Sequence, residues 1–411
     1  FFFKQKTAYE IRNCDWSSDV CSSDLVYRLG YNDLQNASVP VNAWFSPDRY
    51  QLFHRGKEQF IRVLDNDQNG IFNNGDFIEF IGAKNDGAFD AQIYDTLPSQ
   101  PNPFQSLFND TAAYFLTYNL NSTNNRRMKV ENDQNFSAYP SAALVKVSEV
   151  VTAAQDYNIG DRDANAIADN SYTQGEGFYF NKVSYNQNTS VDFTINKANT
   201  SITAPEVEMV QMGANALAHP YSILVNGSTL TTNAIYGYSL NKDVLSLSIF
   251  PTNGNLNVKL QPLADASNPF NANYMNVAYV KCSYDRTTDF TGESLPKKIF
   301  LEQNNSKYVV NFTSVSASNP LLYVIDNDTV HTMVLNNNNG NFNVLIPAFN
   351  GKSNMLLLDN SQVYYANGNV TIESVNKDPN PNSYARFNNY KLSGATADFL
   401  IVSRSEEHTS E

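Results

Sequence analysis

The sequence predicts an all-β protein with two or more sandwich-like or barrel-like domains. Short apolar runs alternate with turns rich in Asn, Ser, Thr and Gly over most of the chain, a pattern typical of strands joined by tight loops. Asn-Gly dipeptides at 226–227, 253–254 and 367–368 indicate hairpin turns, because both residue types accept positive φ. The 24 Tyr and 26 Phe residues supply aromatic side chains that suit β-sheet cores.

The composition limits the classes of function. At 411 residues the chain is long enough for two or three domains with ordinary cores. Its formal net charge of -13 argues against nucleic-acid binding, which needs a basic surface. No apolar run reaches about 18 residues, so we expect no membrane span in this segment. Only 17% of the residues are charged, as in extracytoplasmic β-proteins, so we expect a secreted or cell-surface location.

The two ends of the sequence have a different origin from the rest. Arg404–Glu411 reads R-S-E-E-H-T-S-E, and the reverse complement of one back-translation of it encodes S-D-V-C-S-S-D-L, the residues at Ser18–Leu25. We therefore interpret 1–25 and 404–411 as translated sequencing adapters and exclude both from the native fold. Cys282 is then the one genuine cysteine, which leaves no disulfide framework and no cysteine-based zinc site.

The remaining chain is expected to divide into three parts. Residues 26–185 form an N-terminal β domain, in which strands at Phe60–Leu64 and Phe77–Ile81 flank an acidic loop. Residues 186–390 form a β-sandwich region. Residues 391–403 follow a Pro/Asn-rich connector and contain A-D-F-L-I-V at Ala397–Val402, a run of the buried parallel-strand type.

The acidic loop is the best candidate metal site. Its oxygen-bearing residues have the D-x-D-x-N-G spacing of a calcium loop, with an aspartate in place of the usual final glutamate. Calcium is the candidate ion because a hard cation prefers several oxygen ligands. Strands flank the loop, so it is not an EF-hand, and a plain Asx-rich turn remains the alternative interpretation. The candidate ligands are Asp65, Asp67, Asn69, Ile71, Asn73 and Asp76.

Several blocks of the sequence resemble the N-terminal region of gingipain-like cysteine peptidases of Bacteroidota, a group that includes the sortase of the type IX secretion system. The blocks occur in the same order as in that family, over about 26–180, and the longest lie at 75–87 and 109–117. They read V-Y-R-L-G-Y-N-D-L, R-G-K-E, G-D-F-I-E-F-I-G-A-K-N-D-G, S-L-F-N-D-T-A-A-Y-F-L-T and Y-T-Q-G-E-G-F. The resemblance implies that 391–403 begin a truncated α/β catalytic domain.

Catalytic residues are not expected in this chain. Cys282 lies in a strand pattern, where a small buried residue is the common case. His54 fits a surface position, His219 a loop and His331 a strand. Glu79 lies on a predicted strand and Asp86 in the turn after it, and nothing in the sequence indicates a pocket around them. The resemblance places the catalytic His and Cys of the family downstream, so we expect the segment itself to be inactive while its parent is a peptidase.

The leading functional hypothesis is therefore a non-catalytic, scaffolding or propeptide-like region of a secreted gingipain-like cysteine peptidase linked to type IX secretion. Its expected partners are the missing catalytic domain and either secretion machinery or a protein substrate. The alternative is a surface adhesin or glycan-binding β-sandwich protein without peptidase activity, to which an aromatic-rich face would be suited.

Overall fold

A computed structural model describes residues 9–13, 25–39, 41, 46–108, 112–119, 124–162, 167–168, 171–265, 272–326, 329–365 and 370–374. Strands dominate these ranges, and the predicted all-β class is confirmed. The one α-helix within them is α1, Tyr31–Asn36. It begins directly after β2, Leu25–Gly30, because the Asp33 carboxylate accepts a hydrogen bond from Gly30 N (2.9 Å) and caps the first turn.

A first lobe contains two small sheets, of orders β25-β2-β6-β5 and β26-β1-β7-β3-β4. Its core gathers fully buried side chains such as Leu29, Tyr50 and Leu116. The predicted strands around the acidic loop are confirmed as β5 and β6, which pair antiparallel. The strands are β1 Tyr9–Asn13, β2 Leu25–Gly30, β3 Tyr50–His54, β4 Lys57–Glu58, β5 Ile61–Leu64, β6 Phe77–Gly82, β7 Ala113–Tyr118, β25 Tyr364–Tyr365 and β26 Val370–Ser374.

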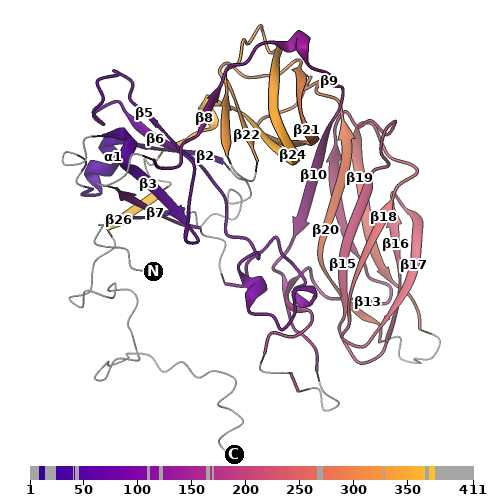
Figure 1. Cartoon of the computed structure of the whole chain (residues 1–411). Coiled ribbons are helices and arrows are strands. Elements are labelled where there is room, and N and C mark those ends of the chain that lie inside the picture. Colours follow the sequence, from indigo (N-terminus) through magenta and orange to yellow (C-terminus); the bar gives the residue numbers. More distant parts are fainter. Residues whose placement is uncertain are drawn as a thin grey trace, which may run out of the picture.

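An 11-stranded sheet forms the centre of the molecule, with the order β18-β15-β20-β10-β21-β24-β22-β23-β8 and with β13 and β9 attached to β20 and β21. It extends from the yellow strands at the top of Figure 1 to the magenta strands at the right. Its strands are β8 Lys129–Glu131, β9 Ser141–Ala142, β10 Val145–Thr152, β13 Val183–Ser184, β15 Glu206–Gly213, β18 Leu240–Ser246, β20 Tyr274–Arg286, β21 Lys297–Phe312, β22 Pro320–Ile325, β23 Val330–Met333 and β24 Phe342–Asp359.

A four-stranded sheet of order β14-β19-β16-β17 faces one end of the large sheet. Phe193, Ile223 and Leu256 from this sheet share one apolar cluster with Val207 and Val280 of the large sheet, which is the packing of a β-sandwich. Alternation along β14 is strict, since its odd-numbered residues are buried and its even-numbered ones lie on the outer face. The strands are β14 Thr189–Ile195, β16 Ala218–Val225, β17 Ser228–Tyr236 and β19 Gly254–Pro262.

Short elements complete the structure. Two further strands pair with each other in a separate two-stranded antiparallel sheet. No described helix is long and apolar enough to cross a membrane. The two strands of this small sheet are β11 Asp156–Ile159 and β12 Glu176–Tyr179, and the 3-10 helices are η2 Pro47–Arg49, η3 Asp90–Gln92, η4 Leu97–Ser99, η5 Phe136–Ala138 and η6 Asn360–Gln362.

Strand pairing crosses the domain boundary expected at residue 185. β10 pairs with β20 over its whole length, and β8 pairs with β23, so 124–185 contribute strands to the large sheet rather than to the first lobe. Conversely, β25 and β26 return from the far end of the chain to join the first lobe. β1 lies within the segment interpreted as adapter-derived and pairs between β7 and β26. The segment 391–403 lies outside the described residues.

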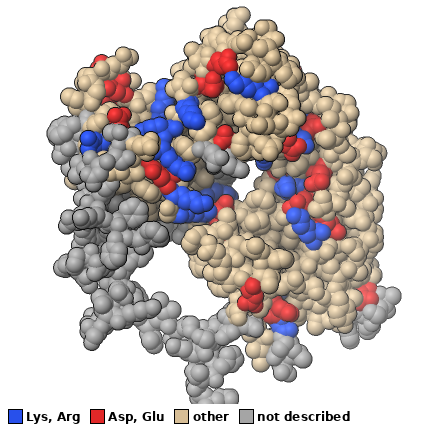
Figure 2. All heavy atoms as spheres, in the orientation of Figure 1, with Lys and Arg blue, Asp and Glu red and all other residues tan. Residues whose placement is uncertain are grey.

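The parts surround a central opening. Figure 2 shows this gap between the first lobe and the large sheet, with Lys and Arg side chains on both of its sides. The lobes touch beside it, because Val26 of β2 packs with Tyr323, Leu356 and Leu358 of the large sheet in one apolar cluster.

Candidate functional site

The acidic loop between β5 and β6 brings its three aspartates together. One carboxylate oxygen each from Asp65, Asp67 and Asp76 lies within 4.8 Å of the others. The Asp65 carboxylate accepts hydrogen bonds from Gly70 N (2.7 Å) and Asn69 N (3.2 Å), which folds the chain around it. Gly70 has φ +77°, a conformation that favours glycine and permits this turn.

Asp76 anchors the base of the loop. Its side chain is buried and accepts hydrogen bonds from Asn66 N and Asn73 N, both at 2.8 Å. Phe72 is buried beside it, and its ring lies 5.1 Å from the ring of Tyr50 in the core of the first lobe. The buried Phe72 ring therefore attaches the loop to the core of the lobe, and the buried Asp76 carboxylate closes the base of the loop.

The other predicted ligands are held inside the loop. The Asn69 side chain accepts from Ile71 N (2.7 Å) and donates to Asp67 (2.8 Å), and the Asn73 amide also donates to Asp67 (3.1 Å). The hydrogen bond from Asn73 lowers the pKa of Asp67, so this carboxylate keeps its charge.

These contacts bear on both interpretations of the loop. The oxygen-rich donor set suits a hard cation such as calcium, and within the described residues no Lys or Arg forms an ion pair with any of the three aspartates. The same backbone hydrogen bonds are also those of an Asx-rich turn, in which side-chain oxygens cap nearby N–H groups.

The sulfur of Cys282 is not arranged for nucleophilic catalysis. Cys282 is fully buried on β20, and burial together with the nearby Glu149 charge raises the pKa of its thiol to about 12. A peptidase nucleophile needs a thiolate paired with a histidine. Among the described residues, no histidine lies within hydrogen-bonding distance of Cys282.

The three histidines within the described residues have other surroundings. His219 is fully buried, and its ring nitrogens lie 3.0 Å from Asn273 Oδ1 and from Asn215 O. His54 stacks on Tyr114, with ring centroids 4.4 Å apart. The Nε2 atom of His331 lies 3.7 Å from the Asp326 carboxylate, and burial lowers the pKa of its ring.

A buried ionic junction is a feature that the sequence did not reveal. Glu79 is fully buried on β6, where it binds Arg28 Nε of β2 at 2.7 Å and accepts a hydrogen bond from Tyr323 Oη of β22 at 2.9 Å. The same guanidinium donates to Asn360 Oδ1 (2.8 Å) and to Tyr365 Oη (2.9 Å). The one signal in the sequence was the lone charge of Glu79 within the apolar run F-I-E-F-I-G. Its partners Arg28 and Tyr323 lie 51 and 244 residues away along the chain, so no local pattern indicates them.

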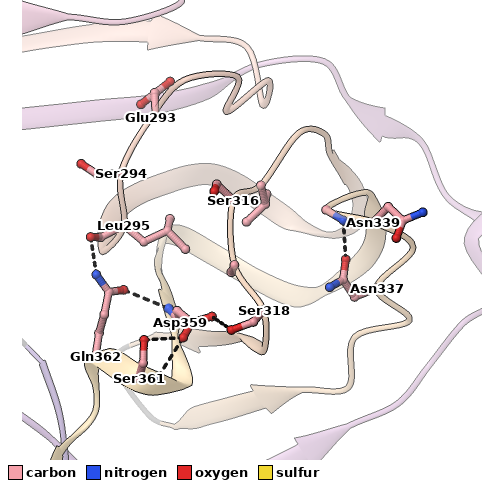
Figure 3. Close-up of a pocket in the computed structure, with 13 residues that line it drawn as sticks. Glu293, Ser294, Leu295, Ser316, Ser318, Asn337, Asn339, Asp359, Ser361 and Gln362 are labelled. Atoms are coloured by element: carbon pink, nitrogen blue, oxygen red, sulfur yellow. Dashed lines mark hydrogen bonds between the residues drawn. The ribbon is translucent and has the colours of Figure 1, made fainter.

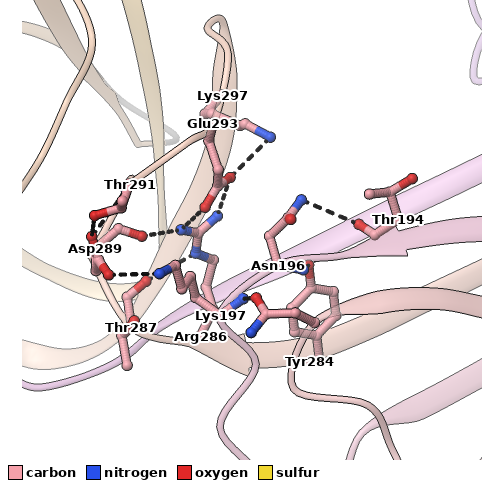
Figure 4. A network of polar contacts seen from close by, with 11 residues as sticks. Thr194, Asn196, Lys197, Tyr284, Arg286, Thr287, Asp289, Thr291, Glu293 and Lys297 are labelled. Carbon is pink, nitrogen blue, oxygen red and sulfur yellow. Dashed lines mark hydrogen bonds and ion pairs between the residues drawn. The ribbon is translucent and has the colours of Figure 1, made fainter.

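A second buried ion pair, Arg286 with Glu293, holds the segment that connects β20 to β21. Figure 4 shows Arg286 held by both carboxylate oxygens of Glu293, at 2.9 and 2.6 Å, with Lys297 Nζ 3.1 Å from the same group. Nearby, Lys197 binds Asp289 at 2.8 Å. Such bidentate geometry fixes the orientation of the two chain segments.

An open hollow of about 850 Å³ lies beside η6 (Figure 3), and its lining is mainly Ser, Asn and carboxylate groups. At its base Asp359 accepts hydrogen bonds from Ser361 N (2.9 Å) and Asn319 N (2.9 Å). These bonds lower the pKa of Asp359 to about 2. The described lining contains no aromatic ring of the kind that commonly stacks on sugars.

The fold and the site together define an all-β, multi-lobed protein with an acidic Asx loop and a buried ionic junction between lobes. No protein-family model and no curated protein match the sequence. Among solved structures, the described fold is similar to dimeric latent PorU from Porphyromonas gingivalis, with a TM-score of 0.57 and 9% sequence identity. The match covers 88% of this chain and 32% of the PorU chain, so the sequence spans about a third of that protein's length.

Carbohydrate-binding modules give much weaker matches. A CBM36-1 domain of a xylanase from the hindgut metagenome of Trinervitermes trinervoides covers 33% of this chain at 15% identity, and a CBM36 solved with calcium and xylotriose covers 33% at 16% identity. Both TM-scores are 0.20, so these matches do not support a shared fold.

Proposed function

We propose that this chain is the non-catalytic, N-terminal β-rich region of a gingipain-like cysteine peptidase linked to type IX secretion. The single observation that supports this most strongly is the similarity of fold to PorU over 88% of the chain. The sequence blocks at 75–87 and 109–117, which resemble gingipain-like peptidases, point to the same family.

The proposed role is structural. The Arg28–Glu79–Tyr323 junction joins the first lobe to the large sheet through buried, charge-assisted hydrogen bonds, which orient the two parts. The proposed partner is the catalytic domain of the same polypeptide, which this region would scaffold or hold latent, with secretion machinery or a protein substrate as a further partner. The corresponding location is extracytoplasmic, secreted or on the cell surface.

A peptidase assay on the purified chain tests the non-catalytic assignment. We expect no hydrolysis of casein or of fluorogenic peptides, because the buried thiol of Cys282 has no histidine base within the described structure. Thiol-dependent hydrolysis that disappears in a Cys282→Ala variant would overturn the assignment.

We also propose that the loop from Asp65 to Asp76 binds calcium as a structural ion. The three clustered carboxylates, with the side-chain oxygens of Asn69 and Asn73 and the carbonyl of Ile71, would provide the ligands. A bound ion would offset the repulsion between the carboxylates and stiffen the loop that Phe72 attaches to the core. The chemistry that it supplies is neutralisation of charge, with no role in catalysis.

A further inference from the structure

Asn-Gly pairs can lose the asparagine amide without an enzyme. The backbone nitrogen of the glycine attacks the side-chain carbon Cγ of the asparagine, and glycine has no side chain to obstruct the approach. The described residues contain six such pairs, and a seventh, at 367–368, lies outside them. The reaction needs a glycine nitrogen that is free of hydrogen bonds and an asparagine side chain that can turn towards it. The contacts of each pair therefore decide where the reaction can occur in the folded chain.

Two of the six pairs have a glycine nitrogen that is already engaged. Gly70 N donates a hydrogen bond to the Asp65 carboxylate at 2.7 Å. Gly340 N donates to Asn337 Oδ1 at 2.8 Å. Attack by either nitrogen requires that hydrogen bond to break first, so the folded structure protects Asn69 and Asn339.

Three other pairs are held by a strand or through the asparagine side chain. Residues 350–351 lie within β24 and belong to its ladder with β21. Asn253 Oδ1 accepts a hydrogen bond from the backbone nitrogen of Lys197 at 2.9 Å. Asn226 Oδ1 accepts from the backbone nitrogen of Asn257 at 2.9 Å, and Asn226 N donates back to Asn257 O at 2.9 Å. Each of these three pairs is therefore fixed to a neighbouring stretch of backbone.

The pair Asn74–Gly75 meets both conditions. Both residues are exposed in the turn that leads from the acidic loop into β6. Gly75 N donates no hydrogen bond among the described residues, and a Cβ atom placed on Gly75 would meet nothing within 4 Å. The Asn74 side chain has one described contact, in which its Oδ1 accepts from the exposed amide of Asn32 at 2.9 Å. A single surface side chain therefore restrains this asparagine, where the backbone restrains the others.

We propose that Asn74 is a modification site, which loses its amide by spontaneous deamidation in the folded protein. Gly75 N bonds to Asn74 Cγ and gives its proton to solvent, and Nδ2 takes up a proton and leaves as ammonia. Water then adds to either carbonyl carbon of the resulting succinimide ring, and residue 74 becomes aspartate or isoaspartate. The net reaction consumes water and releases ammonia, with no change of oxidation state.

The isoaspartate product changes the geometry at the base of the acidic loop. Asp76 closes that base by accepting hydrogen bonds from Asn66 N and Asn73 N, both at 2.8 Å. In isoaspartate the main chain runs through the side-chain carbon, so an additional backbone atom separates Asn73 from Asp76. We expect this change to disrupt the closure and loosen the loop. The inference rests on contacts of the polypeptide alone and does not depend on calcium or on the proposed scaffolding role.

Peptide mass mapping of the full chain during incubation at mildly alkaline pH tests the site. It gives the rate of amide loss at each described Asn-Gly pair, in the native chain and in guanidinium, so that each site serves as its own reference. Unfolding should accelerate the loss at least about tenfold at the five protected pairs and less than about threefold at Asn74. An acceleration at Asn74 as large as that at the other pairs overturns the proposal.

Hydrogen exchange in the presence of chelator tests the consequence for the loop. The deamidated chain is isolated by ion exchange and checked by mass mapping for isoaspartate at position 74. Its amides at 66–73 should exchange at least about tenfold faster than those of the unmodified chain, while the amides of β17 keep their rates. The matched control is Asn74→Asp, which carries the added charge on a normal backbone and should change exchange less than about twofold. Unchanged exchange in the isoaspartate form, or equal acceleration in Asn74→Asp, overturns the proposed effect of the backbone change.

Discussion

Arg28 and Glu79 face each other as direct register partners on β2 and β6, and their side chains form a buried ion pair at 2.7 Å. Glu79 is fully buried, and the hydroxyl of Tyr323 reaches it from the large sheet. Groups from both lobes therefore bind this one carboxylate at the same time.

Removal of Arg28 should destabilise the protein strongly. An Arg28→Met substitution removes the 2.7 Å ion pair of the buried Glu79 carboxylate and leaves it only the longer contact with Arg62 at 3.8 Å, so we expect a loss of about 3 kcal/mol in the free energy of unfolding. Urea unfolding followed by tyrosine fluorescence measures the loss. Tyr323→Phe, which removes one hydrogen bond to a charged group, should cost about 1.5–3 kcal/mol.

The double variant Arg28→Met/Glu79→Leu serves as the control for this prediction. Replacement of both charges by apolar groups of similar size is commonly close to neutral, so it should recover most of the stability lost in Arg28→Met. Equal instability of the single and double variants would show that shape, rather than the uncompensated charge, governs the junction.

Calcium should raise the melting temperature of the chain. An ion that binds only the folded state stabilises it by about 2.7 kcal/mol at a concentration of about 100 times Kd. Calorimetry with millimolar calcium, against the same protein in chelator, measures the shift. An Asp65→Ala/Asp67→Ala variant should lose it, while Asp192→Ala, which removes an exposed carboxylate on β14, should retain it. An absent shift, or an equal shift in the double variant, contradicts the metal assignment.

Asp359 should contribute to the acid sensitivity of the fold. Its folded-state pKa is lowered to about 2, first by the hydrogen bond from Asn319 N, whereas an aspartate in an unfolded chain has a pKa of about 3.9. Its contribution is therefore complete above about pH 4 and is lost as the pH falls towards 2. An Asp359→Asn variant should be less stable at pH 7, and its stability should fall less steeply than the wild type between pH 4 and pH 2.5. Parallel pH profiles from urea unfolding would refute this.

Cys282 should resist modification while the protein is folded. Burial raises the pKa of its thiol to about 12, so little reactive thiolate exists at pH 8. Iodoacetamide labelling followed by peptide mass mapping should find the Cys282 peptide unmodified in buffer and fully modified in 6 M guanidinium. Rapid labelling of the native chain at this residue would show that the thiol is accessible.

Part of this architecture could be predicted because its signals are local. The short apolar runs on either side of the acidic loop predict the strands that the structure has there as β5 and β6. The Asn226–Gly227 turn joins β16 to β17 as expected, with φ values of 47° and 81°. The loop residues Asp65, Asp67 and Asp76 were grouped from spacing alone, and the structure places their carboxylates together.

Other features depend on contacts that local patterns do not contain. Asn253–Gly254 was expected to make a hairpin, but β18 and β19 belong to different sheets, because turn residues permit a reversal without choosing the paired strands. The short apolar runs at 308–312, 342–346 and 355–358 are parts of the long strands β21 and β24. These continue through exposed polar residues, and their register shifts at Asn304/Ser306 and Ser306/Tyr308 break the alternation.

The central claim, that this chain is the β-rich region of a gingipain-like peptidase, is tested most directly by reading the source DNA beyond the codon for Ser403. The account predicts that the coding sequence continues with alternating strand and helix patterns, a histidine at a strand end and a later cysteine. A stop codon, or further Asn-Gly hairpin patterns without that pair, would contradict the account and favour an adhesin-like protein.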